Sequence, residues 1–204
     1  FISALLVSII LLIPMLIVSI IILCKDFGSP FYKQKRVGKN GKELKVWKFR
    51  SMKKGADDLK NMLTPEQYKE YQKEFKLDDD PRLIGYKSEG DGKNGKCFGS
   101  KIRRTSIDEL PQIFFNICIL GNMSVVGPRP MLKEELEKYY TPEQQKIILS
   151  AKPGLTGLWQ ACARNNATYA SGERQILELY YVENRSVITD IKILIKTVIS
   201  VIKH

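Results

Sequence analysis

The chain has 204 residues, 44% of them hydrophobic, so it can form a domain with a buried core and is not a disordered segment. It carries 33 Lys and Arg against 22 Asp and Glu, a formal charge of +11, which favours an acidic partner such as phosphate, nucleic acid or anionic lipid. Its four cysteines form no C-x-x-C pair and one His accompanies them, which argues against a zinc site and a disulfide framework.

The first element is an apolar segment over residues 1–24, which contains no charged side chain and consists mainly of Ile, Leu and Val. A helix of this length would extend roughly 36 Å, slightly more than the hydrocarbon core of a bilayer, so a spanning helix is one interpretation. Pro14 predicts a kink in its middle, which also permits a re-entrant helix that enters and leaves by the same face. The sequence does not begin with Met, so we expect further residues upstream.

A basic segment follows directly. Residues 25–60 hold twelve Lys or Arg and four Asp or Glu, a net charge of +8. The positive-inside rule places such a segment on the cytoplasmic side of the membrane, where the cysteines also stay reduced. We therefore predict a membrane anchor over residues 1–24 and a cytosolic domain over residues 25–204.

The cytosolic part reads as a small β-hairpin followed mostly by helices, an α+β class. Residues 31–32 and 44–49 are strand-like around a Gly-Lys-Asn-Gly turn. Thr64-Pro65-Glu66 begins a helix over about 65–77, and the glycine-rich residues 85–99 form a loop. Further helices are predicted over about 108–119, 131–139, 142–150, 172–184 and 187–203. The last is amphipathic, which suits either a core-facing helix or a helix lying in the bilayer interface.

The paired acids Asp108 and Glu109 follow two arginines, one of them Arg103. Carboxylates hold Mg²⁺ through oxygen ligands while guanidiniums bind phosphoryl oxygens, so the group fits phosphate chemistry. Two structural interpretations compete. Ser106 and Glu109 have the spacing of a capping box, and Asp108 could itself be a helix N-cap.

Other basic residues are candidates for phosphate contacts. Arg129 lies between two prolines, which present its side chain from a stiff backbone. Lys48 and Arg50 alternate on a strand and suit either phosphate or lipid headgroups. Residues 152–160 form a glycine-punctuated loop that could hold a nucleotide or be a structural turn. The sequence has no nucleotide-triphosphate loop, dinucleotide fingerprint or helix-turn-helix pattern.

Taken together, six stretches make the chain resemble the bacterial sugar transferase family, the monotopic polyprenyl-phosphate phosphoglycosyl transferases. The resemblance covers nearly the whole chain, and the D-E-L-P-Q to G-P-R-P stretch is the most specific part. The stretches are KFRSM (48–52), DPR (80–82), RRTSIDELPQ (103–112), GNMSVVGPRP (121–130), KPGLTGLWQ (152–160) and DIKILIKT (190–197).

This resemblance implies an enzyme that transfers a sugar 1-phosphate from a UDP-sugar to undecaprenyl phosphate and releases UMP. Asp108 would be the nucleophile that forms a covalent phosphosugar intermediate, with Mg²⁺ bound by Asp108 and Glu109, and Glu109 would act on the incoming lipid phosphate. Pro14 would break the re-entrant anchor. The residues implied in substrate or phosphate binding are Arg129, Arg103, Lys48, Arg50, Arg164 and Glu178, the last standing where the family has Asp.

The implied setting is the bacterial cytoplasmic membrane, with the catalytic domain facing the cytoplasm in a pathway of surface polysaccharide or glycan synthesis. Membrane lipid would be a partner, a homo-oligomer is compatible with the sequence, and nucleic acid is not expected. The alternative is a non-catalytic membrane-surface adaptor whose basic segment binds anionic lipid or a partner protein. An adaptor would tolerate Asn at position 108, whereas a nucleophile would not.

Overall fold

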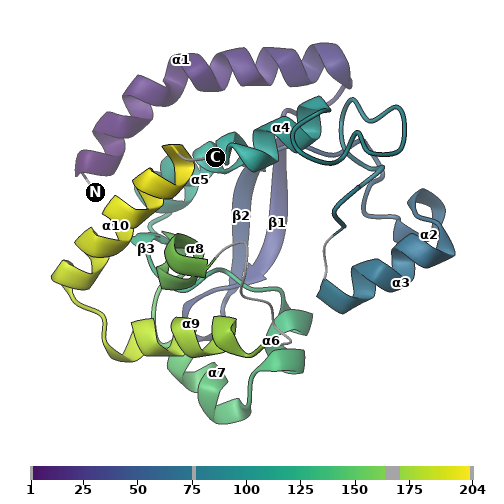
Figure 1. Cartoon of the computed structure of the whole chain (residues 1–204). Helices are drawn as coiled ribbons and strands as arrows, with labels where there is room; N and C mark the ends of the chain where they lie inside the picture. The colour runs from purple at the N-terminus through teal and green to yellow at the C-terminus, as the bar shows by residue number, and fades with distance from the viewer. Residues whose placement is uncertain (1, 75–76, 164–170, 203–204) are drawn as a thin grey trace. The chain divides into compact units, whose positions relative to one another are not determined.

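The computed structural model describes residues 2–74, 77–163 and 171–202 and has an α+β fold (Figure 1). The chain forms two compact units. The first comprises residues 1–6, 33–47 and 112–204, and the second comprises residues 7–32 and 48–111. The predicted class is therefore confirmed, whereas the division into an anchor and a cytosolic domain stays a prediction.

The first helix, α1 (Ile2–Lys25), continues through Pro14 and bends along its length (Figure 1). Met15, Val18 and Ile22 recur on one face and pack against Phe49 and Ile84 in the core of the second unit. Many of its other large apolar side chains are exposed, namely Ile9, Ile10, Leu12, Ile13, Leu16, Ile17, Ile20 and Leu23. Within the described ranges, no helix combines the length and apolar character needed to cross a bilayer.

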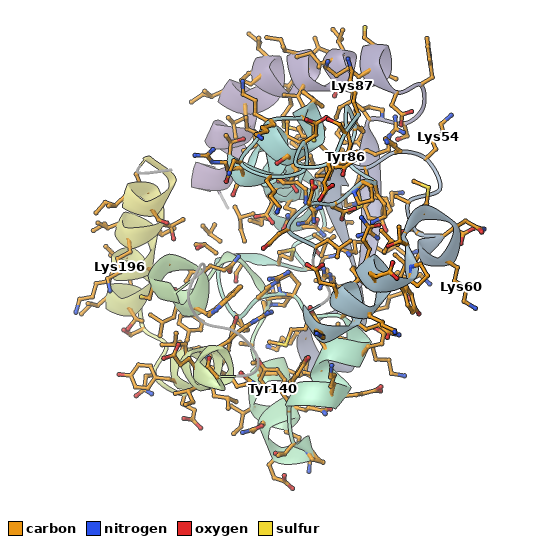
Figure 2. All side chains as sticks on the ribbon, turned by 45° about the vertical axis from the view of Figure 1, so that its right-hand side comes forward. Lys54, Lys60, Tyr86, Lys87, Tyr140 and Lys196 are labelled. Carbon is orange, nitrogen blue, oxygen red and sulfur yellow. The ribbon has the colours of Figure 1, made fainter. Side chains whose placement is uncertain are left out.

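The predicted hairpin is confirmed as strands β1 (Phe31–Val37) and β2 (Glu43–Phe49), joined by the 3₁₀ turn η1 (Lys39–Gly41). In β2, Leu44 and Val46 alternate with exposed residues and are buried, as expected for a strand with one covered face. Many lysines of the basic segment are exposed, including Lys54 and Lys60, which Figure 2 labels.

The remainder of the second unit consists of short helices and an ordered loop. Its helical elements are α2 (Leu59–Met62), α3 (Pro65–Glu74), α4 (Phe98–Arg104), η2 (Ile107–Glu109) and the start of α5 (Leu110–Gln112). The Thr64 cap is confirmed, because its hydroxyl accepts from the Gln67 N–H. The glycine-rich loop is also confirmed, and the Asp79 carboxylate organises it by accepting the N–H groups of Gly90 and Gly92.

The first unit contains a short parallel sheet, against which its C-terminal helix packs. Its remaining elements are η3 (Ile113–Ile119), β3 (Ser124–Val126), α6 (Lys133–Tyr139), α7 (Pro142–Leu149), β4 (Gly154–Thr156), α8 (Leu158–Ala163), α9 (Glu173–Glu183) and α10 (Val187–Ile202). Strands β3 and β4 pair in parallel, with Ser124 opposite Gly154 and Val126 opposite Thr156. Helices α7 and α8 pack against α9, and α10 packs against α8.

Two predicted helices differ in detail. The helix predicted over 108–119 consists of 3₁₀, α and π turns in succession, and Asn116 in the π segment is fully buried. Its side chain accepts from the Trp47 N–H and donates to the Lys45 carbonyl, so this segment is bonded to β2. In α10, Ile193 is buried, whereas the predicted apolar stripe is exposed at Ile188, Ile191, Leu194, Ile195 and Val198. The core-facing interpretation of that stripe is therefore wrong.

Candidate active site

The two acidic residues Asp108 and Glu109 lie in the 3₁₀ turn η2 that follows α4. Ser106 occupies the N-cap in a left-handed conformation (φ 56°), and its side chain makes no capping hydrogen bond. The predicted capping box is therefore absent from this described turn, and Asp108 is not the N-cap. Only 6% of the Asp108 surface is exposed, so its carboxylate lies in a largely desolvated position.

Lys48 and Glu109, 61 residues apart in sequence, form an ion pair. The Lys48 Nζ donates to Glu109 Oε1 at 2.8 Å, and each side chain is 24% exposed. A hydrogen bond between charged groups at this depth is stronger than a surface ion pair, because less water competes for it. The second unit therefore brings together three predicted residues, Lys48, Glu109 and the adjacent Asp108.

The other basic candidates of this unit differ in their surroundings. Arg103 is exposed at the end of α4. The Arg50 guanidinium binds the Asp26 carboxylate and the Asp26 carbonyl, so it ties the residue after α1 to the residue after β2. Both terminal nitrogens of the Arg50 guanidinium thus already have partners, which favours a structural role for Arg50.

A magnesium ion fits this donor set only with help from a substrate. Among the described residues there is no cluster of three or more His, Cys, Asp or Glu side chains that could hold a metal. Mg²⁺ in phosphate chemistry commonly uses one or two carboxylates and completes its shell with substrate phosphates and water. Asp108 and Glu109 match that mode, although Lys48 already binds one oxygen of Glu109.

In the first unit, Arg129 follows β3 in a turn held by close backbone contacts. The Gly127 N–H donates to Thr156 O, and the Gly154 N–H donates to Pro128 O, both at 2.9 Å. A Cβ on Gly154 would lie 2.1 Å from the Gly127 nitrogen, so this crossing requires glycine. The glycines of residues 152–160 thus serve backbone packing. The structure has strand β4 and the start of helix α8 where the sequence predicts a loop.

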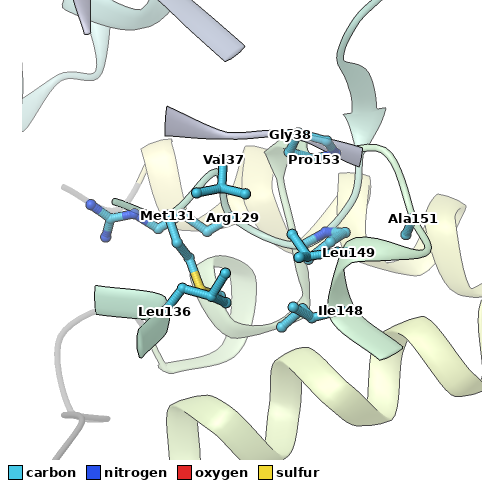
Figure 3. Close-up of a pocket in the computed structure, with 10 residues that line it drawn as sticks. Val37, Gly38, Arg129, Met131, Leu136, Ile148, Leu149, Ala151 and Pro153 are labelled. Atoms are coloured by element: carbon cyan, nitrogen blue, oxygen red, sulfur yellow. The ribbon is translucent and has the colours of Figure 1, made fainter. Parts of the chain in front are cut away.

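Beneath this turn lies a small cavity of about 20 Å³ with largely apolar walls, including Val37, Met131, Leu136 and Ile148. Figure 3 shows that the Arg129 guanidinium points away from this cavity.

Glu178 lies on α9 with 1% of its surface exposed, and both of its carboxylate oxygens accept the main-chain N–H of Arg129, at 3.1 and 3.3 Å. Burial raises the pKa of the Glu178 carboxyl to about 7, against the opposing effect of Arg174 and of the Arg129 N–H and guanidinium. Glu178 thus binds the Arg129 main chain, and its predicted contact with substrate stays a prediction.

Sequence reasoning missed two members of this cluster, Arg174 and Trp159. Arg174 is buried, and its guanidinium carbon lies 4.2 Å from the centroid of the Trp159 ring, while that of Arg129 lies 5.5 Å from the same centroid. Arg174 precedes Glu178 by four residues on a helix, a spacing that predicts a pair on one face. Arg164, also a candidate, lies outside the described residues.

Comparisons with known proteins agree with one another. The profile of the family described as Bacterial sugar transferase matches residues 1–204. A UDP-galactose-lipid carrier transferase of Erwinia amylovora is 39% identical over 95% of the chain and 38% of its own length. An undecaprenyl-phosphate galactose phosphotransferase of Salmonella typhimurium is 41% identical over 85% of the chain and 33% of its own length.

A shorter relative is matched over most of its length. The exopolysaccharide production protein ExoY of Sinorhizobium fredii is 40% identical over 85% of the chain and 70% of its own length. By contrast, the chain spans less than two fifths of the Erwinia and Salmonella relatives.

Proposed function

Because the chain belongs to the bacterial sugar transferase family, we propose that it transfers a sugar 1-phosphate from a UDP-sugar to undecaprenyl phosphate and releases UMP. The names of the relatives support both substrates, since one couples UDP-galactose with a lipid carrier and another names undecaprenyl phosphate. The observation that carries the proposal is the buried Asp108 beside a Glu109 carboxylate that Lys48 holds at 2.8 Å.

In the first step, an Asp108 carboxylate oxygen attacks the phosphorus that carries the sugar. A bond forms between aspartate oxygen and phosphorus, the bridging P–O bond of the diphosphate breaks, and UMP leaves with the bridging oxygen. In the second step, an oxygen of undecaprenyl phosphate attacks the same phosphorus and displaces the Asp108 carboxylate. Dividing one transfer into two displacements lowers the barrier of each.

The attacking carboxylate and the diphosphate are both anions, so the site must offset their repulsion. Lys48 supplies a positive charge beside the acidic pair, and we assign Glu109 to orient the incoming lipid phosphate. Mg²⁺ held by Asp108 and Glu109 would neutralise charge on phosphate oxygens when bound. In the first unit, Arg129 presents a guanidinium suited to bidentate phosphate binding.

We propose that the protein acts at the cytoplasmic membrane, with its catalytic residues facing the cytoplasm, in surface polysaccharide synthesis. The exposed apolar side chains of α1 and α10 and the net charge of +8 over residues 25–60 support a position at a lipid surface. The names of exopolysaccharide relatives support the pathway class.

UMP release tests this function. Detergent-solubilised protein with undecaprenyl phosphate and Mg²⁺ is given a panel of UDP-sugars that includes UDP-galactose. We expect release with at least one donor. It should fall by about 10³-fold or more in Asp108→Asn, because an amide is a far weaker nucleophile than a carboxylate, and it should be lost on chelation, because the charge of the phosphate oxygens is then not neutralised. Asp57→Asn, an exposed carboxylate in the same unit, is the matched control. Folded protein that releases no UMP with any donor would favour the adaptor alternative.

A further inference from the structure

We infer that Glu178 is a positioning residue, which holds Arg129 in place through the main-chain N–H of Arg129 rather than by touching a substrate. Within residues 128–130, both flanking residues are prolines and have no N–H. Arg129 therefore supplies the single main-chain donor of the Pro-Arg-Pro turn, and Glu178 accepts it.

The burial of Glu178 supports this role. A carboxylate with 1% of its surface exposed is costly unless its oxygens accept hydrogen bonds and its charge is balanced. Both oxygens lie within hydrogen-bond distance of the Arg129 nitrogen, and the buried Arg174, one turn earlier on α9, provides opposite charge. These contacts hold the carboxylate against the main chain of Arg129.

Trp159 constrains the other end of Arg129. The guanidinium of Arg129 and that of Arg174 both lie over its ring, an arrangement that orients each cation relative to the indole. Glu178 thus holds the main chain of Arg129, and Trp159 orients its side chain. Arg174 links the two, since it balances the charge of Glu178 and contacts Trp159.

The inference rests on the proposed function, because its main measurement is the KM for the phosphate substrates. Glu178→Gln keeps a carbonyl oxygen that can accept the Arg129 N–H, whereas Glu178→Met has a similar size and no such acceptor. We expect Glu178→Met to raise the KM for the UDP-sugar or undecaprenyl phosphate roughly 10- to 100-fold, with a smaller change in kcat. Glu178→Gln should restore KM to within about threefold of wild type. Glu183→Met, at the exposed end of the same helix, is the control.

A measurement without turnover tests the contact itself. In full-length protein labelled with ¹⁵N-arginine, the Arg129 amide resonance should move in Glu178→Met and stay near its wild-type position in Glu178→Gln. If wild type releases no UMP while this pattern holds, the proposed function fails and the contact stands. Unchanged KM values in Glu178→Met would overturn the inference. It would also be overturned if both variants lost activity only in proportion to a lowered unfolding temperature.

Discussion

The ion pair between Lys48 and Glu109 places a positive charge against one of the two adjacent acids. The ammonium lies 2.8 Å from one Glu109 oxygen, and both side chains are about three-quarters buried. Removing either side chain would therefore leave the charge of the other unpaired in a largely buried position. We expect Lys48→Gln to lower kcat/KM for UMP release about 10- to 100-fold.

Glu109→Gln should have an effect of similar size, and the double variant should lose less than the product of the two. Such non-additivity is expected for residues in direct contact. Initial rates of the four proteins measure this coupling, and strictly multiplicative losses would mean that the pair does not act as a unit. Lys45→Gln, an exposed lysine of the same strand, serves as the control.

Glu178 should make the stability of the fold depend on pH. Its pKa is raised from 4.5 to about 7 by burial, so the folded state binds this proton more tightly than the unfolded state does. The resulting stabilisation is fully present below about pH 4.5 and is lost as pH rises through about 7, a difference of roughly 3 kcal/mol.

Urea unfolding of wild type between pH 4.5 and 8 measures that change. In Glu178→Gln, which cannot titrate, the corresponding fall in the free energy of unfolding should disappear, while Glu183→Gln should retain it. A fall of equal size in Glu178→Gln would assign the pH dependence to other groups.

For single residues, the sequence singled out candidates for phosphate chemistry but not the contacts that they make. Asp108, Glu109 and Lys48 could be singled out because they are charged residues of two recognisable stretches, RRTSIDELPQ and KFRSM. Their pairing was not predictable, since a hairpin and a distant 3₁₀ turn bring Lys48 to Glu109. The hydrogen bond between Glu178 and the Arg129 main chain was not predictable either, because 49 residues separate the two.

Among the elements, the parallel pair of β3 and β4 has the greatest influence on the Arg129 turn. A methyl group on Gly154 would meet the Gly127 backbone at 2.1 Å, and backbone cannot move aside as a flexible side chain can. We expect Gly154→Ala to lower the free energy of unfolding by about 2 kcal/mol or more. Chemical unfolding measures this. In the comparison variant Gly121→Ala nothing lies within 4 Å of the added carbon, so it should lose only the roughly 1 kcal/mol that a left-handed backbone (φ 58°) costs a residue with a side chain. Equal losses in the two variants would contradict the close crossing.

Elements specified by neighbouring residues were predicted well from sequence. Thr64 caps its helix by accepting the N–H of Gln67, as the Thr-Pro-Glu start indicated, and Thr141 caps α7 in the same way through Gln144. Strand β4 was missed because it has three residues and its partner lies 30 residues away. Helix α8 was missed because its first residues, 158–160, lie within the glycine-punctuated stretch that was predicted to be a loop.

For the whole molecule, membrane binding through apolar contacts and membrane binding through charge should depend differently on salt concentration. Exposed residues of α1 such as Ile10 and Ile13, at 73% and 71%, would hold the protein on a bilayer independently of salt. We expect the chain to stay with anionic vesicles at about 1 M salt, where surface charge is screened over about 3 Å. Ile10→Ser with Ile13→Ser should weaken retention, and co-sedimentation measures both. Release of wild type by salt alone would instead favour charge-driven binding.

We propose that Asp108 forms a covalent bond to the sugar phosphate. Intact-mass spectrometry tests it on wild-type protein mixed with the active UDP-sugar and Mg²⁺ in the absence of undecaprenyl phosphate. We predict that the protein gains the mass of one sugar phosphate, and that digestion assigns this gain to the peptide that contains Asp108. The gain should be absent in Asp108→Asn and lost when undecaprenyl phosphate is added. An adduct that persists in Asp108→Asn would contradict a covalent bond at Asp108. UMP release that needs both substrates together and leaves no adduct would contradict it as well.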